Sequence, residues 1–163
     1  MPGPGEYRPD ATERIDKVHD LPTPHRKQRQ RNRKYAPCPH CGCRCPRRRT
    51  ATRMLHDLGN RETGRPVEID FLFSVHRCYD CKKYFCIDLS DIAASGSSYT
   101  KRVVDTAVRY VVEDGSPYRD ASWRLWRDHR VFVPFATIQN WVEAAGEKNL
   151  CDHRNQRLVR LGV

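Results

Sequence analysis

Four cysteines of this chain form two Cys-x-x-Cys pairs, Cys38 with Cys41 and Cys78 with Cys81. A Cys-x-x-Cys turn directs both thiolates at one point, and two such turns supply the four sulfur ligands of a tetrahedral Zn²⁺ site. The interval between the pairs exceeds the ~15–20 residues usual for this pattern, and a long hairpin would absorb the excess. The spacing therefore predicts one structural zinc ion, which contributes folding energy to a small domain.

The other four cysteines are Cys43, Cys45, Cys86 and Cys151. We interpret them as free thiols of a protein in a reducing compartment, where disulfides are rare. Cys41, Cys43 and Cys45 alternate along the chain, so we do not expect all three to face one metal ion. Two alternatives stay open, which are an exchange of Cys43 for Cys41 as a ligand and a second metal site.

Catalysis at the predicted zinc site is not expected, because four thiolates leave no position for a water molecule. A thioredoxin-type redox role is disfavoured, because no βαβ pattern surrounds either cysteine pair. We therefore predict that the chain is not an enzyme by itself.

The charge of the chain favours a polyanionic partner. Its formal net charge is +10, and no Asp or Glu occurs between Leu21 and His56. Charge that only aids solubility would be mixed in sign, whereas clustered Lys and Arg suit a phosphate backbone. The alternative is a solvated basic surface without a partner. The side chains expected to contact DNA are Arg26, Lys27, Arg29, Arg31, Arg33, Lys34, Arg47, Arg48, Arg49 and Arg53, with Lys101 and Arg119 from the helices.

The sequence divides into five stretches and predicts an α+β fold. Residues 1–34 are rich in Pro, Gly and basic side chains, and we expect a disordered basic arm with a short helix over Ala11–His19 at most. Residues 35–90 form a small antiparallel zinc ribbon, and the small residues 91–98 form a linker. Residues 99–147 form a three-helix helix-turn-helix domain, and residues 148–163 form a tail.

The prediction of a zinc ribbon rests on an alternation of apolar and polar residues. Val67–His76 follows a period of two, which is typical of a half-buried antiparallel strand. Thr50–Leu58 is predicted as its partner across a turn at Gly64, and Tyr84–Leu89 as a third strand.

The prediction of a helical second domain rests on the spacing of apolar residues. Apolar residues repeat at helical spacing over Val103–Val112, and Gly115 follows as a terminator. Ser116-Pro117 is predicted to start a second helix with Ser116 as its N-cap. Val133-Pro134 is predicted to start a third helix that ends near Gly146.

In a helix-turn-helix the last helix lies in the DNA major groove. The residues that would face outward near its start are Ala136, Thr137, Gln139 and Asn140. Gln and Asn amides can pair with adenine, and the alternative is that both amides are ordinary solvated groups. Trp123 and Trp126 are expected as core anchors. Arginines of the second helix would lie along the DNA backbone: Arg119, Arg124, Arg127 and Arg130.

These parts, in this order, resemble the N-terminal half of a class of bacterial insertion-sequence transposases. The resemblance covers residues 36–146 and rests on moderately specific motifs. The resembling segments are Cys38-Pro-His-Cys41-Gly, Thr52–Leu58, Gly64-Arg-Pro-Val67, His76-Arg-Cys-Tyr-Asp-Cys81 with Phe85, and Ser116 through Trp141. The resemblance implies recognition of transposon-end DNA by a zinc ribbon and a helix-turn-helix together.

The chain departs from this class after the helices. Such transposases continue into an RNase-H-like domain whose three carboxylates hold two Mg²⁺ ions. After Ala145 this chain has only two acids, Glu147 and Asp152. We expect a truncated transposase, a DNA-binding fragment of a longer one, a subunit whose catalytic half lies in another chain, or a DNA binder derived from one.

The function predicted from the sequence is zinc-dependent, sequence-specific binding of duplex DNA without strand transfer. An RNA-binding zinc-ribbon protein is the alternative, and a homodimer or a catalytic partner subunit stays open. Neither a secretory signal nor an apolar run of the ~20 residues of a membrane span is present. We therefore expect a cytoplasmic, nucleoid-associated protein that does not contact a membrane.

Overall fold

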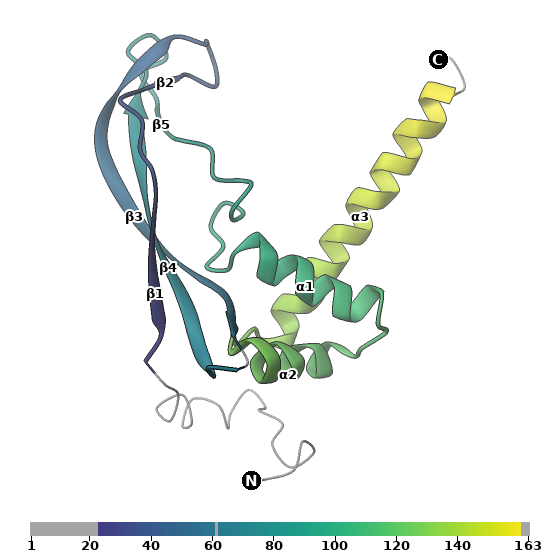
Figure 1. Cartoon of the computed structure of the whole chain (residues 1–163). Coiled ribbons are helices and arrows are strands. Elements are labelled where there is room, and N and C mark those ends of the chain that lie inside the picture. Colours follow the sequence, from purple (N-terminus) through teal and green to yellow (C-terminus); the bar gives the residue numbers. More distant parts are fainter. Residues whose placement is uncertain (1–22, 61, 161–163) are drawn as a thin grey trace.

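The computed structural model describes residues 23–60 and 62–160, with side chains up to residue 147. The described residues form an α+β structure, as the sequence predicts, with one five-stranded sheet and three helices (Figure 1). The expected helix over Ala11–His19 lies outside them. The elements are β1 (His25–Arg31), β2 (Tyr35–Pro37), β3 (Arg44–Asn60), β4 (Arg65–Arg77), β5 (Tyr84–Cys86), α1 (Lys101–Val112), α2 (Tyr118–His129) and α3 (Phe135–Arg160).

The long antiparallel hairpin β3–β4 forms the body of the sheet. The predicted alternation holds in the first half of β4, where Val67, Ile69 and Phe71 are buried and the residues between them are half-buried. It fails toward the cysteine end, where Ser74 and His76 of the predicted polar face are buried as well. Strand β3 begins six residues before the expected Thr50, because residues 44–46 pair with β2 and Arg47 and Arg49 pair with β4. It extends past Leu58 to Asn60, which pairs with Arg65. The expected third strand over Tyr84–Leu89 is shorter, since only β5 pairs with the end of β4.

Strand β1 shows that the predicted disordered arm over residues 1–34 is wrong for His25–Arg31, while residues 1–22 lie outside the described part of the chain. His25–Arg31 pairs in parallel with β4 at the sheet edge, with Arg29 opposite Phe71. The backbone groups on one side of this polar segment pair with the free edge of β4. Two bonds of 2.7 Å between the Arg31 guanidinium and the Asp91 carboxylate hold the strand end. Sequence polarity therefore concealed an edge strand, for which such exposed charged residues are common.

The segment over residues 91–98 is more than a flexible linker. It covers one face of the sheet (Figure 1), where Ala93 is buried against Leu55, Ile69 and Phe71. The Arg53 guanidinium donates to the carbonyls of Ala94 and Ser97 and fixes the segment to β3. The prediction that residues 91–98 serve only as a linker is therefore wrong, because their small side chains allow the segment to pack closely on the sheet.

The three helices pack around a second core formed by Val103, Ala107, Leu125, Val133 and Ile138. The apolar face predicted for α1 is thus confirmed at Val103 and Ala107, whereas Val112 at its end is exposed. Trp126 is buried, as expected for a core anchor, and Trp123 is half-buried.

The helix ends differ from the predictions at two places. Helix α2 begins at Tyr118 after Pro117, and the Ser116 hydroxyl accepts a bond from Arg124 rather than capping the helix. Helix α3 continues through Gly146 to Arg160, so the predicted end near Gly146 and the separate tail over 148–163 are wrong for residues up to 160. Gly146 does not have the positive φ of a terminating glycine, and a single helical glycine costs only about 1 kcal/mol.

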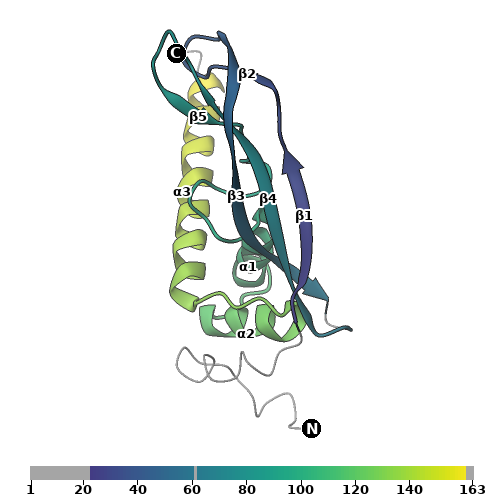
Figure 2. The same ribbon diagram turned by 90° about the vertical axis from the view of Figure 1, so that its left-hand side faces the viewer.

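The helices lie at the end of the hairpin where a turn joins β3 to β4, opposite the end that carries the cysteine pairs (Figures 1 and 2). The Asp57 carboxylate of β3 is buried and accepts bonds from Thr100 Oγ1 at 2.7 Å and Arg102 Nη1 at 3.1 Å. The Thr100 amide also donates to the carbonyl of His56 at 3.0 Å. These contacts fix the start of α1 on β3, so the hairpin and the helices form one connected structure.

Candidate metal centre and nucleic-acid interface

The two cysteine pairs meet at the far end of the hairpin. The sulfur atoms of Cys38, Cys41, Cys78 and Cys81 all lie within 4.8 Å of one another, and those of Cys41 and Cys78 are 3.5 Å apart. Strands β2 and β3 frame the first pair, and β4 and β5 frame the second. The four predicted ligands are therefore close enough to bind one metal ion.

The two turns share one backbone pattern. The amide of Cys38 donates to the carbonyl of Cys43, and the amide of Cys78 donates to the carbonyl of Lys83, both at 2.9 Å. Gly42 follows the first pair with φ of 74°, and Lys82 takes the matching place after the second with φ of 57°. These turns direct the sulfurs inward, and backbone amides donate to Cys38 Sγ and Cys78 Sγ at 3.4 Å.

The surroundings of Cys78 and Cys81 shift the pKa values of these two thiols in opposite directions. The backbone amide of Cys81 is the largest cause that lowers the pKa of Cys78 to about 6. Hydrogen bonding with Cys41 raises the pKa of Cys81 to about 12. Because zinc binds thiolates, a bound cation would displace the protons of these thiols. A set of four inward thiol groups fits a soft or borderline metal ion.

Cys45 packs against Cys38 and Cys78, and His76 contacts Cys45 and Phe85. The sequence did not reveal this packing. The Cys45 thiol is buried, which raises its pKa to about 11, and it donates to the carbonyl of Cys43 at 3.3 Å. The His76 ring is fully buried between Ser74 Oγ at 2.9 Å and the Cys45 carbonyl at 3.2 Å, and it stacks on Phe85. Alternation placed His76 on the polar side of β4, and only its proximity to Cys78 distinguished it.

Cys43 is exposed and lies beside the second turn. Its thiol donates to Asp80 Oδ2 at 2.9 Å, and this bond is the largest cause that raises the pKa of Cys43 to about 12. Cys41, Cys43 and Asp80 form another group whose ligand atoms lie within 4.8 Å of one another. Cys86 is exposed, and the side chain of Cys151 lies outside the described part of the chain.

Exposed tyrosines surround the cysteine end of the hairpin, and the sequence analysis missed them. Tyr79 and Tyr84 are both 59% exposed, and the Arg77 guanidinium lies 5.9 Å and 5.5 Å from their ring centroids. Tyr35 is 40% exposed and carries the Arg44 guanidinium at 4.2 Å. Their position beside or inside the Cys-x-x-Cys pairs was the available indication.

Several predicted DNA contacts gather near these tyrosines. The Arg47 amide donates to the carbonyl of Lys34 at 2.9 Å, and its guanidinium donates to Asn32 Oδ1 at 2.7 Å. These bonds bring the chain after β1 beside the first half of β3. Arg48, Arg49 and Tyr84 line a shallow hollow on this surface. We call the basic and aromatic side chains at this end of β3–β4, away from the turn that joins the two strands, the hairpin tip. All of them are exposed except Arg77, which is half-buried: Arg33, Lys34, Tyr35, Arg44, Arg47, Arg48, Arg49, Arg77, Tyr79 and Tyr84.

Other predicted contacts have partners within the protein. Arg31 binds Asp91, and Arg53 binds the carbonyls of residues 94 and 97, so both arginines stabilise the fold. Arg26 pairs with Glu68 at 3.3 Å. Lys27 and Arg29 are exposed on β1, away from the hairpin tip.

The predicted contacts of α3 lie mostly at the surface. Ala136, Gln139 and Asn140 are exposed, Thr137 is half-buried, and Gln139 Nε2 donates to Glu143 Oε1 at 2.9 Å. The Arg119 guanidinium lies 4.8 Å from the centroid of the Phe135 ring. Lys101 is exposed at the start of α1.

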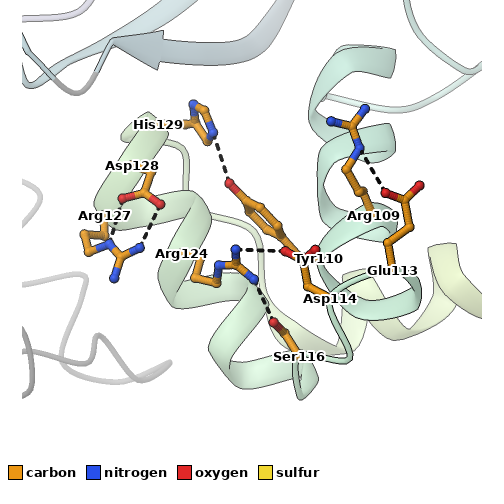
Figure 3. A network of polar contacts seen from close by, with 9 residues as sticks. All are labelled: Arg109, Tyr110, Glu113, Asp114, Ser116, Arg124, Arg127, Asp128 and His129. Carbon is orange, nitrogen blue, oxygen red and sulfur yellow. Dashed lines mark hydrogen bonds and ion pairs between the residues drawn. The ribbon is translucent and has the colours of Figure 1, made fainter.

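Two arginines in the second half of α2 bind other residues of the protein, and Arg124 links α2 to the end of α1 and the loop after it (Figure 3). Arg124 binds Asp114 at 2.9 Å and Ser116 at 2.8 Å, and its guanidinium lies 3.9 Å from the Tyr110 ring centroid. Arg127 makes two bonds to Asp128, at 2.7 Å and 2.8 Å. These side chains are therefore less available to a DNA backbone than the sequence suggested.

No protein-family model, curated protein or solved structure matches this chain. Within the described residues, each helix is too short or too polar to cross a membrane.

Proposed function

We propose that the protein binds nucleic acid, and duplex DNA in particular, through the hairpin tip and the start of α3. The observation that carries this proposal is the hairpin tip itself, where arginines and exposed tyrosines surround a group of four cysteines. Guanidinium groups bind phosphates, and aromatic rings against arginines are typical of nucleic-acid surfaces.

The metal in this proposal is one Zn²⁺ ion held by Cys38, Cys41, Cys78 and Cys81. Zn²⁺ prefers a tetrahedral set of thiolates, and four sulfurs leave no open position. The ion would be structural, because it would join the β2–β3 turn to the β4–β5 turn. No catalytic role is proposed for it.

The start of α3 is the proposed source of sequence specificity. The exposed side chains of Gln139 and Asn140 lie in its first turns, where a recognition helix presents its base contacts. The bond from Gln139 to Glu143 would have to open before the Gln139 amide could pair with adenine. The resemblance to insertion-sequence transposases extends the proposal to transposon-end sites, with catalysis supplied by another polypeptide.

Salt dependence of duplex binding tests the electrostatic part of the proposal. Each phosphate contact contributes about −0.9 to the slope of log K against log salt. Replacement of Arg49 at the hairpin tip by alanine should make this negative slope shallower by about 0.9. Arg109→Ala is the matched control, because Arg109 is equally charged, exposed and paired with Glu113 on α1. A slope near zero for the wild-type protein would refute the proposal.

Selection from a random duplex pool tests specificity. We expect one enriched motif for the zinc-loaded protein and loss of preference at one position in Gln139→Ala or Asn140→Ala. Equal binding of all sequences would restrict the proposal to non-specific contact.

RNA or another single strand is the second candidate, and the exposure of Tyr79 and Tyr84 favours it. Bases stack on such rings with about 1–3 kcal/mol each. Tyr84→Leu should weaken single-strand binding more than duplex binding. Tighter binding of structured RNA than of duplex DNA at equal salt would decide for this candidate.

A further inference from the structure

A second group of metal-ligand atoms lies next to the four-cysteine site. It consists of Cys41, Cys43 and Asp80, whose ligand atoms are all within 4.8 Å of one another. We propose that these three side chains bind a second thiophilic divalent cation, such as Zn²⁺, and that Cys41 bridges the two ions.

The distances suit such a site. With Zn–S bonds of about 2.3 Å and Zn–O bonds of about 2.0–2.2 Å, tetrahedral ligand atoms lie roughly 3.5–3.8 Å apart. The separation of 2.9 Å between Cys43 Sγ and Asp80 Oδ2 therefore has to widen by less than 1 Å. Both side chains are exposed, so this widening meets little resistance from packing.

The two turns bring these ligands together. Cys43 follows the first cysteine pair, whereas Asp80 lies inside the second pair. The turns face each other across the first site, so Cys43 reaches Asp80 while the four inward sulfurs meet. The matching positions in the opposite turns hold Lys83 and His40, and a lysine cannot complete an equivalent thiolate site there.

Charge also favours a second cation. Zn²⁺ with four thiolates carries two net negative charges, and Asp80 adds a third beside them. A second divalent cation would displace the proton that Cys43 shares with Asp80 and would bind the resulting thiolate. No electron is transferred, and the proton is released to solvent.

The remaining thiols are not suited to this role. Cys45 is buried and donates to the Cys43 carbonyl, and Cys86 belongs to neither ligand group among the described residues. Three protein ligands leave one position of the second ion for water. The second ion should therefore bind more weakly than the first.

Metal stoichiometry of the full chain tests the proposal. Native mass spectrometry with Zn²⁺, and Co²⁺ titration followed by thiolate-to-metal absorption, should give two equivalents for the wild-type protein. Cys43→Ala and Asp80→Asn should each give one equivalent and keep the first. Cys86→Ala is the matched control, because it removes an exposed thiol outside both groups and should keep two equivalents.

Either of two results would overturn the proposal. One is saturation of the wild-type protein at a single equivalent, which would reduce the Cys43–Asp80 contact to an ordinary hydrogen bond. The other is a second equivalent that persists in both Cys43→Ala and Asp80→Asn, which would place that ion elsewhere. The proposal rests on the first zinc site but not on nucleic-acid binding. A protein that binds two ions and no DNA would refute only the proposed function.

Discussion

Replacement of Asp57 by alanine should loosen the attachment of the helices to the hairpin. The Asp57 side chain is 5% exposed, and Thr100, which donates to it, is also buried. Loss of a hydrogen bond to a buried charged group costs about 1.5–3 kcal/mol. The Arg102 side chain is 67% exposed, so its ion pair adds only about 0–1 kcal/mol.

We therefore expect Asp57→Ala to lower the free energy of unfolding by about 2–3 kcal/mol. For a chain of this size, that loss lowers the melting temperature by about 4–12 °C. Urea unfolding of the metal-loaded protein, followed by far-ultraviolet circular dichroism, measures it. The control is Arg102→Ala, with an expected loss below about 1 kcal/mol. If Asp57→Ala stays within about 0.5 kcal/mol of wild type, or if Arg102→Ala costs as much, the reasoning is wrong.

Three further predictions concern packing, metal and pH. Gly59→Ala should cost more than about 3 kcal/mol in urea unfolding, because the added Cβ would lie 2.5 Å from the carbonyl oxygens of Arg65 and His129. Its control is Gly146→Ala, which meets nothing within 4 Å and should gain about 0.5–1 kcal/mol. Chelation should disrupt the environment of Tyr84 while the helical signal at 222 nm persists, and simultaneous loss of both would contradict a local role for the metal. Arg31 lowers the pKa of Asp91, so the stability from this pair is present above the ordinary aspartate pKa and is lost as pH falls through the lowered value. The variant Arg31→Ala should therefore raise the pKa of Asp91 in an NMR titration. An unchanged pKa would exclude the pair.

The parts of the structure that the sequence predicted are those that follow a local periodicity. Alternation in β4 and the apolar face of α1 each depend on burial of one side, which residue spacing records directly. The four cysteines could be grouped because Cys-x-x-Cys turns have a fixed geometry. Their closeness is the part of the candidate site that spacing alone could give.

The parts that were missed depend on contacts distant in sequence. Strand β1 has no apolar face, and its pairing is visible only once the open edge of β4 exists. The burial of His76 follows from the approach of Cys45 and Phe85. The roles of Arg31 and Arg53 follow from a loop that folds back over the sheet. Composition marks such residues only as basic, so it could not separate structural arginines from exposed ones.

The parallel pairing of β1 has a consequence for the order of folding. The hairpin β3–β4 closes over a short turn, whereas β1 must find residues 67–73 across the whole intervening chain. Contacts of large sequence separation form late because loop closure costs entropy. Strand β1 should therefore join last and open first, and its amide hydrogens should exchange faster than those of β3 and β4. Such opening would release a basic segment of seven residues, His25–Arg31, while the hairpin stays folded.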